Sequence, residues 1–123
     1  MNLALVFPGQ GSQNKSMLDG FSDNECFQNT IQKASDILNY NINKVVQDDT
    51  KLNNTIYTQP IILAVSYAIF EILNNECDYS VKISAGHSLG EYSALVCNRT
   101  ISFEDGLLLV KKRAELMSNA MEN

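Results

Sequence analysis

The stretch VKISAGHSLG at residues 81–90 joins a short apolar segment to a glycine-rich turn. Its first five residues predict a buried β-strand, and the residues after the turn predict a helix that continues to about Cys97. A Gly-x-Ser-x-Gly sequence between a strand and a helix is typical of a nucleophile elbow, in which a strained turn lifts the serine hydroxyl clear of the sheet edge. The two glycines allow the strand and helix backbones to approach closely, because they lack a Cβ atom. Ser88 is therefore a candidate nucleophile, and an ordinary strand-to-helix turn is the alternative.

Two turns could supply backbone donors beside this serine. The amide of Leu89 is predicted to point toward the same space as the Ser88 hydroxyl, at a helix N-terminus whose dipole favours a developing oxyanion. The sequence PGQGSQ at residues 8–13 follows a predicted strand at residues 3–7. Its glycines permit close approach of the backbone to a ligand, and α/β sheets bind substrates at the carboxyl ends of parallel strands. A tight glycine turn without a binding role is the alternative for residues 8–13.

His87 is the single histidine of the sequence. Neighbouring side chains at such a turn point in different directions, so we predict that His87 has a structural role or lines the pocket wall, and is not the base for Ser88. A serine nucleophile nevertheless needs a base. The sequence holds no other imidazole that could act as one.

The charge balance argues against some classes of partner. Nine basic and fourteen acidic residues give a net charge of −5. A nucleic-acid or anionic-membrane surface is not expected, because either needs a concentrated basic face. The basic cluster that does occur is Lys111-Lys112-Arg113. On spacing alone this cluster is a solvated helix face, and the alternative is that Arg113 forms a bidentate clamp for a carboxylate.

The composition is that of one ordinary globular domain, with 123 residues of which 45% are hydrophobic and 19% are charged. The three cysteines are odd in number and widely spaced, so they predict neither a disulfide framework nor a metal site. The longest uncharged apolar stretch, residues 60–70, is shorter than the roughly 20 residues that cross a bilayer. We therefore expect a cytoplasmic protein without membrane contact.

Strands that alternate with helices predict an α/β fold, in which helices pack on the faces of a parallel sheet. Two predicted strands do not make a sheet that can stand alone, so part of the sheet is expected to be missing. The remaining patterns predict a helix after a capping box at Ser22 and Glu25, short helical turns in residues 39–55, and a central helix from Pro60 to about Asn75. After the helix that follows the elbow, Asn98 is predicted to adopt a left-handed backbone conformation. A final helix, capped at Ser102, is predicted to have an apolar stripe that extends to Met121.

Three motifs occur in order along the chain: FPGQGSQ at residues 7–13, TQP at residues 58–60 and GHSLGEYSALV at residues 86–96. Together they resemble the acyltransferase family of fatty-acid and polyketide synthesis, which includes the malonyl-CoA:acyl carrier protein transacylases. The family fold is an α/β-hydrolase-like core interrupted by a small ferredoxin-like subdomain. The resemblance implies that residues 1–123 are the N-terminal portion of the large subdomain, with the inserted subdomain and the C-terminal part absent. Residues 98–100 depart from the small residues usual in the family after the elbow helix.

The resemblance also implies roles for individual residues. Ser88 would carry a malonyl group as an ester, and the backbone amides of Gln10 and Leu89 would form the oxyanion hole. Arg113 would hold the malonyl carboxylate, and Gln59 would line the pocket. The family's catalytic histidine lies downstream of the motifs present here. We therefore expect residues 1–123 alone to turn over poorly or not at all.

The reaction implied by the resemblance is a ping-pong acyl transfer. Malonyl-CoA esterifies the serine, CoA leaves, and the pantetheine thiol of acyl carrier protein takes the malonyl group. CoA is a substrate carrier, and no bound cofactor or metal is expected. The competing class is a serine esterase or thioesterase, which shares the elbow, but Gln10 and Arg113 favour the transferase because a hydrolase of simple esters needs no carboxylate clamp. A third reading is a truncated fragment without catalytic activity.

Overall fold

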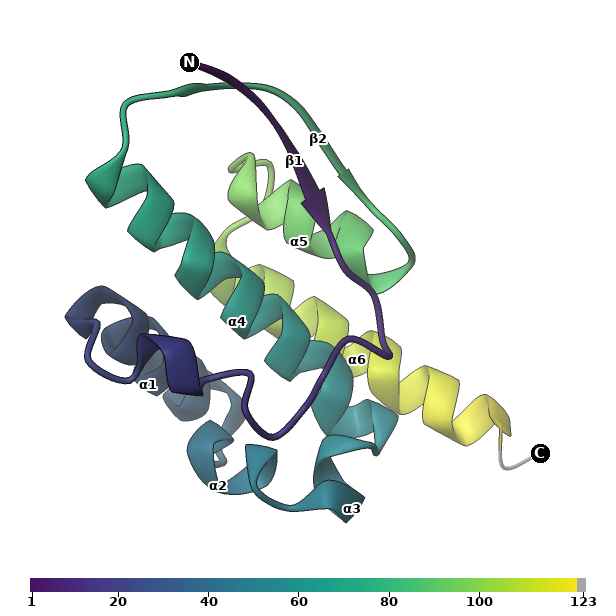
Figure 1. The fold of residues 1–123 in the computed structure, drawn as a ribbon. Helices are drawn as coiled ribbons and strands as arrows, with labels where there is room; N and C mark the ends of the chain where they lie inside the picture. Colours follow the sequence, from purple (N-terminus) through teal and green to yellow (C-terminus); the bar gives the residue numbers. More distant parts are fainter. Residues whose placement is uncertain (122–123) are drawn as a thin grey trace.

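The computed structural model describes residues 1–121, in which strands alternate with helices. The elements are β1 (Asn2–Phe7), the 3-10 turn η1 (Asp19–Phe21), α1 (Glu25–Leu38), α2 (Ile42–Val46), α3 (Asp49–Leu52), α4 (Thr55–Glu76), β2 (Ser80–Gly86), α5 (Leu89–Cys97) and α6 (Phe103–Met121). Figure 1 shows α4 crossing the middle of the molecule, with α1, α5 and α6 packed around it and the two strands beside α5. The predicted α/β class, with a parallel sheet and flanking helices, is confirmed.

The core is built around α4. The fully buried side chains of the core come from all six α-helices, and the largest of them include Phe27, Ile31, Ile42, Leu52, Ile61, Leu63, Leu89, Leu107 and Val110. By length and composition alone α4 could cross a membrane, but 56% of its apolar window is buried inside the molecule. In this fold α4 is the central core helix, as its apolar character on nearly all faces predicts.

β1 and β2 pair in parallel, in a register that places Asn2 opposite Ser80 and Phe7 opposite Gly86. The turns that follow both strands therefore start at the same edge of the sheet. The sheet is thinly covered, since Val6 is 79% exposed and Ile83 is 64% exposed. Apolar residues of parallel strands are normally buried on both faces, so this exposure agrees with the prediction that part of the sheet is missing.

α4 begins at Thr55 rather than at the predicted Pro60. The side chain of Asn54 caps it by accepting from the amide of Ile56 at 3.1 Å, and the hydroxyl of Thr58 donates to the carbonyl of Asn54 at 2.9 Å. Pro60 therefore lies inside the helix, where it has no N–H to donate to the preceding turn. The asparagine cap is the stronger start signal here, although proline also favours the first helical turn.

The start of α1 also differs from the prediction. Asn24, not Ser22, is its cap, and the Asn24 side chain accepts from the amide of Phe27 at 2.9 Å. Ser22 instead follows η1, and its amide bonds back to the carbonyl of Asp19. The serine is therefore part of the preceding turn and is too early to cap the helix.

The turn after α5 has its left-handed residue one position later than predicted. Arg99 has φ 66°, whereas Asn98 has φ −83°. The Asn98 side chain accepts from the amide of Thr100 at 3.0 Å, so this asparagine stabilises the turn through its side chain and not through its backbone. The next helix, α6, begins as predicted, because the hydroxyl of Ser102 accepts from the amide of Asp105 at 3.0 Å.

The apolar stripe predicted along α6 is buried only in its first half. Leu107, Val110 and Ala114 are buried, whereas Met117 and Met121 are exposed. Figure 1 shows the reason, since the C-terminal end of α6 extends beyond the other helices. The predicted short helical turns in residues 39–55 are confirmed as α2 and α3.

Candidate active site

Ser88 occupies the turn between β2 and α5 in a strained backbone conformation, with φ 54° and ψ −112°. A non-glycine residue in this region is uncommon and is held there only when its surroundings require it. Here the close packing of backbone around the two flanking glycines holds Ser88 in this conformation. A Cβ atom on Gly86 would overlap the carbonyl group of Gly90, and a Cβ atom on Gly90 would overlap the carbonyl oxygen of Phe7. The end of the strand and the start of the helix are thus as close as the Gly-x-Ser-x-Gly pattern predicts.

The turn after β1 packs against the turn that carries Ser88. A Cβ atom on Gly9 would lie 2.8 Å from the carbonyl oxygen of His87 and 3.5 Å from its Nδ1. Gly11 has φ 113°, a conformation that side chains rarely adopt. Gln10 therefore lies in a glycine-flanked loop held against the second turn. Gly9 of this loop lies against His87, whose structural or pocket-wall role stays a prediction.

A cation lies beside the serine. Arg113 of α6 donates from Nη2 to the hydroxyl oxygen of Ser88 at 3.1 Å. Through Nη1 it donates to Oε1 of Gln59 at 2.5 Å, and its guanidinium lies 5.4 Å from the centre of the Tyr92 ring. The ion pairs within residues 1–121 are Lys15 with Asp49 and Lys112 with Glu115. The charge of Arg113 is therefore not neutralised by a carboxylate of the described chain, and the site is suited to an anion.

Gln59 connects the arginine to the loop after β1. Gln59 is fully buried. Its Nε2 donates to the hydroxyl oxygen of Thr55 at 2.8 Å, and that hydroxyl donates to Oε1 of Gln10, also at 2.8 Å. Hydrogen bonds thus join Ser88, Arg113, Gln59, Thr55 and Gln10 into one chain. These residues come from α4, α6 and the two turns at the carboxyl ends of the strands.

Backbone donors are free at this site. Within residues 1–121 the amide N–H groups of Gln10 and Leu89 donate to no other group. Leu89 is the first residue of α5, so its N–H lies at the positive end of the helix dipole. Free backbone amides that face a nucleophile can stabilise a developing oxyanion, so these two amides are candidate donors.

Within residues 1–121 no proton acceptor is hydrogen-bonded to the Ser88 hydroxyl. Among the described residues, the side chain that bonds to the Ser88 hydroxyl is Arg113 and not His87. A guanidinium cannot take up a proton, because it is always protonated in proteins. In residues 1–121 no three His, Cys, Asp or Glu side chains are placed to hold a metal ion. The described part of the chain therefore supplies a candidate nucleophile, hydrogen-bond donors for an anion and a cation, but no side chain bonded to Ser88 that could act as its base.

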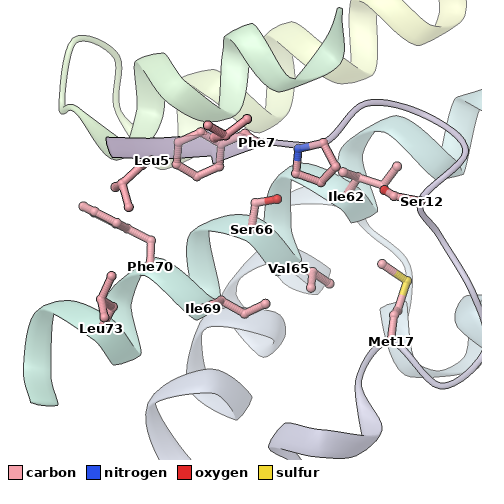
Figure 2. A pocket seen from close by; sticks show the side chains of 12 residues that line it. Leu5, Phe7, Ser12, Met17, Ile62, Val65, Ser66, Ile69, Phe70 and Leu73 are labelled. Atoms are coloured by element: carbon pink, nitrogen blue, oxygen red, sulfur yellow. The ribbon is translucent and has the colours of Figure 1, made fainter. Parts of the chain in front are cut away.

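A separate apolar pocket lies between β1 and α4. Figure 2 shows Leu5 and Phe7 of β1 facing Val65, Ile69 and Phe70 of α4 across it. Its volume is about 380 Å³, and its lining contains no titratable side chain. Neither Ser88 nor Arg113 lines it. This pocket is therefore not the site of the hydrogen-bonded chain.

Thr55 was not among the site residues predicted from sequence. The signal that could have found it is its spacing from Gln59, because residues four apart lie on the same face of a helix. That spacing has meaning only if both residues are helical. A helix predicted to start at Pro60 leaves both of them outside it.

The whole described chain has known relatives. Residues 4–123 match the family model for the acyl transferase domain. The chain belongs to the acyl transferase domain family. It is 39% identical over 126 residues to the malonyl CoA-acyl carrier protein transacylase of Buchnera aphidicola, a match that covers 99% of the chain and 41% of that relative.

Solved structures of acyl transferases are similar to this chain in both sequence and fold. The acyl-carrier-protein S-malonyltransferase of Burkholderia pseudomallei is 44% identical with a TM-score of 0.89, over 94% of this chain and 38% of that one. A malonyl-transacylase in complex with its type II PKS acyl-carrier protein is 42% identical with a TM-score of 0.91, over 98% of this chain and 40% of that one. The chain thus spans about two-fifths of the length of these relatives.

Proposed function

We propose that residues 1–123 are the N-terminal portion of the large subdomain of a malonyl-CoA:acyl carrier protein transacylase, with Ser88 as the nucleophile. The observation that carries the proposal is the contact of Arg113 with Ser88, made by a guanidinium that no carboxylate of the described chain neutralises. A positive charge beside the hydroxyl suits an acyl group that has its own carboxylate, as malonyl does. A hydrolase of simple esters would have no use for this charge.

In the first half-reaction the Ser88 hydroxyl oxygen attacks the thioester carbonyl carbon of malonyl-CoA. A C–O bond forms, the C–S bond breaks, and the serine proton passes through a base to the departing CoA thiolate. We assign the base to a histidine in the rest of the domain, since His87 makes no hydrogen bond to Ser88 among the described residues. The free amide groups of Gln10 and Leu89 would stabilise the oxyanion of the tetrahedral intermediate.

In the second half-reaction the pantetheine thiol of acyl carrier protein attacks the ester carbonyl carbon. The C–S bond to the carrier forms, the C–O bond to Ser88 breaks, and the serine recovers its proton through the same base. A related malonyl-transacylase has been solved in complex with its acyl-carrier protein, which supports this class of partner. The reaction needs no resident cofactor or metal, because CoA arrives with the substrate.

Three side chains would recognise the malonyl group. Arg113 would pair with its carboxylate when the guanidinium nitrogen that now contacts Ser88 turns to the ligand. Gln59 would brace the arginine from behind through its bond to Nη1. His87 would line the wall beside the turn at Gly9. A cytoplasmic location is part of the proposal, and the free state of all three cysteines supports a reducing compartment.

The proposal is tested by the acyl-enzyme that it requires. Full-length protein containing this chain is mixed with malonyl-CoA and its intact mass is measured, with and without the substitution Ser88→Ala. We expect a malonyl adduct on the unsubstituted protein and none on the variant. Ser12→Ala, in the neighbouring turn, is the control and should retain the adduct. An adduct that persists after Ser88→Ala would overturn the assignment.

A further inference from the structure

The hydroxyl of Thr55 lies between two parts of the candidate site. It accepts a hydrogen bond from Nε2 of Gln59 and donates one to Oε1 of Gln10, each at 2.8 Å. Gln59 bonds to Arg113, and Gln10 belongs to the loop after β1. A single hydroxyl therefore links the side chain that braces the cation to the loop that carries a free amide.

From Arg113 to Gln10 the three hydrogen bonds run in one direction. Arg113 donates to Gln59, Gln59 donates to Thr55, and Thr55 donates to Gln10. An arginine can only donate, so it fixes the Gln59 carbonyl oxygen toward itself and the Gln59 amino group toward Thr55. Bonds aligned in this way polarise one another, and removing one weakens its neighbours. Among these hydrogen-bonded residues, Thr55 is the one that both accepts and donates through the same atom.

Gln59 depends on Thr55 for its orientation. Gln59 is fully buried, and the other neighbour of its Nε2 is the sulfur of Met117 at 3.4 Å. A thioether sulfur is a weak acceptor. Without the Thr55 hydroxyl, the buried amino group would keep only that weak partner, and the amide would no longer be held in position behind Arg113.

Gln10 depends on Thr55 in a different way. Its backbone lies between Gly9 and Gly11, and Gly11 has φ 113°. Glycines leave a loop many backbone conformations, so the direction of the Gln10 amide needs a tether. Within residues 1–121 the hydrogen bond from Thr55 is the one that ties the side chain of Gln10 to a helix.

We propose that Thr55 is a positioning residue that couples the carboxylate clamp to the oxyanion loop. It orients Gln59 behind Arg113, and it anchors Gln10 so that the amide of Gln10 faces the Ser88 hydroxyl. Through this coupling, recognition of the acyl carboxylate and stabilisation of the transition state depend on the same hydroxyl. The inference rests on the proposed transacylase function.

The test compares three variants of the full-length protein with malonyl-CoA and with acetyl-CoA. Thr55→Val keeps the shape of the side chain but removes the hydroxyl, and Thr55→Ser keeps the hydroxyl. We expect Thr55→Val to lower kcat for malonyl transfer by about tenfold and to reduce the preference for malonyl over acetyl by a similar factor. Thr55→Ser should recover most of both losses, within about threefold of the unsubstituted protein. Thr58→Val is the control, because the Thr58 hydroxyl bonds only to backbone carbonyl groups.

Gln10→Met gives an independent measure of the same link from its other end. The side chain of Gln10 is exposed, so this variant is expected to fold even if Thr55→Val does not. It should also lower kcat, and in the double variant the two losses should not add, because Thr55→Val already removes the bond to Gln10 that Gln10→Met removes. If kcat and the malonyl preference are unchanged in Thr55→Val and in Gln10→Met, the role of Thr55 is overturned.

The same measurements separate this inference from the proposed function. One result is that the unsubstituted protein forms malonyl-Ser88 while the Thr55 variants have the same kcat and malonyl preference as that protein. This result would overturn the positioning role alone. Unsubstituted protein that forms no malonyl-Ser88 would overturn the function, and the positioning role with it. Loss of activity in Thr58→Val equal to that in Thr55→Val would show that the effect comes from α4 stability, and would also overturn the role of Thr55.

Discussion

The guanidinium of Arg113 donates to the hydroxyl of Ser88 at 3.1 Å, although 25 residues separate them in sequence. The fold produces this contact because α6 packs along α4 and brings its half-buried arginine under the turn at the end of β2. In the proposed reaction, this charge lies next to the acyl group that is esterified to the serine. The acyl groups that benefit are those with a negative charge of their own.

Arg113→Ala should therefore lower kcat/KM selectively for malonyl-CoA. Removing one partner of a shielded charge pair is expected to cost about a hundredfold in rate or more, whereas acetyl-CoA has no carboxylate to lose. Steady-state transfer from both thioesters measures the difference. Lys112→Ala is the control, because Lys112 pairs with Glu115 in an exposed position. Equal losses of kcat/KM for the two substrates would show that Arg113 stabilises the fold. No loss for either substrate would show that Arg113 is a solvated residue of the helix face.

Residues 1–123 alone should transfer malonyl slowly or not at all. The described chain supplies no base for Ser88, and Val6 and Ile83 leave apolar sheet surface exposed. Adding the remaining part of the domain in trans should increase both solubility and transfer, measured by light scattering and by acylation of carrier protein. Robust transfer by the 123-residue chain alone would show that the base has been misassigned.

Much of the fold follows from patterns that act over a few residues. The strand, turn and helix around Ser88 were predictable because apolar periodicity and two glycines specify them locally. Helix starts were harder where two signals compete, as at Ser22 against Asn24 and at Asn54 against Pro60. In each case the observed cap is the asparagine that immediately precedes the first helical turn.

The candidate site was predictable only in part. The positions of Gln10, Gln59 and Arg113 were predicted from the family resemblance, and the structure brings them together in one hydrogen-bonded chain. From spacing alone Arg113 could equally be a solvated residue, because the packing of α6 on α4 has no signature within α6 itself. Thr55 was missed for a related reason, since its role depends on a helix start that was predicted too late.

The competing caps of α1 can be separated by stability measurements. Asn24→Ala should lower the free energy of unfolding by about 1 kcal/mol, because it removes the acceptor for the amide of Phe27. Ser22→Ala should change it by less than about 0.5 kcal/mol, as expected for a surface position without a cap bond. Urea unfolding of both variants gives the comparison. A larger effect of Ser22→Ala would favour the capping box predicted from sequence.

Gly90→Ala should destabilise the protein strongly. The new methyl group would overlap the carbonyl oxygen of Phe7, and a backbone atom cannot move aside without shifting β1. A cost of about 1–3 kcal/mol or more is typical for such overpacking. Gly20→Ala is the matched control, since a Cβ atom at Gly20 has nothing within 4 Å. Thermal unfolding followed by circular dichroism should show a lower Tm for Gly90→Ala only.

Cys97 should resist alkylation. Burial, and to a smaller extent the charge of Glu71, raises the pKa of its thiol to about 12 from an ordinary value of 9.0. Cys77 is exposed and serves as the internal control. At pH 9, iodoacetamide should modify Cys97 at least about a hundredfold more slowly than Cys77, because the thiolate is the reactive form. Comparable rates, measured by peptide mass spectrometry, would contradict the burial of this thiol.

The same shift makes stability depend on pH in the alkaline range. The folded protein holds the Cys97 proton more tightly than the unfolded chain does, so the contribution is fully present below about pH 9 and is lost as pH rises toward 12. Cys97→Ala should therefore unfold with a weaker dependence on pH between these values. An unchanged pH dependence in urea unfolding would argue against the shift.

The parallel pairing of β1 with β2 determines when β1 can pair with its partner strand during synthesis of the chain. β1 leaves the ribosome before the other described elements, yet the partner of Asn2 is Ser80, and a parallel pair cannot close through a short hairpin. Joining ends so far apart carries a loop-closure cost and slows folding. The contacts between α1 and α4 join residues closer in sequence, so these helices can pack while β1 is still unpaired. In the nascent chain β1 thus remains without its partner strand until residues 80–86 emerge, and its apolar side chains depend on the helices for cover until then.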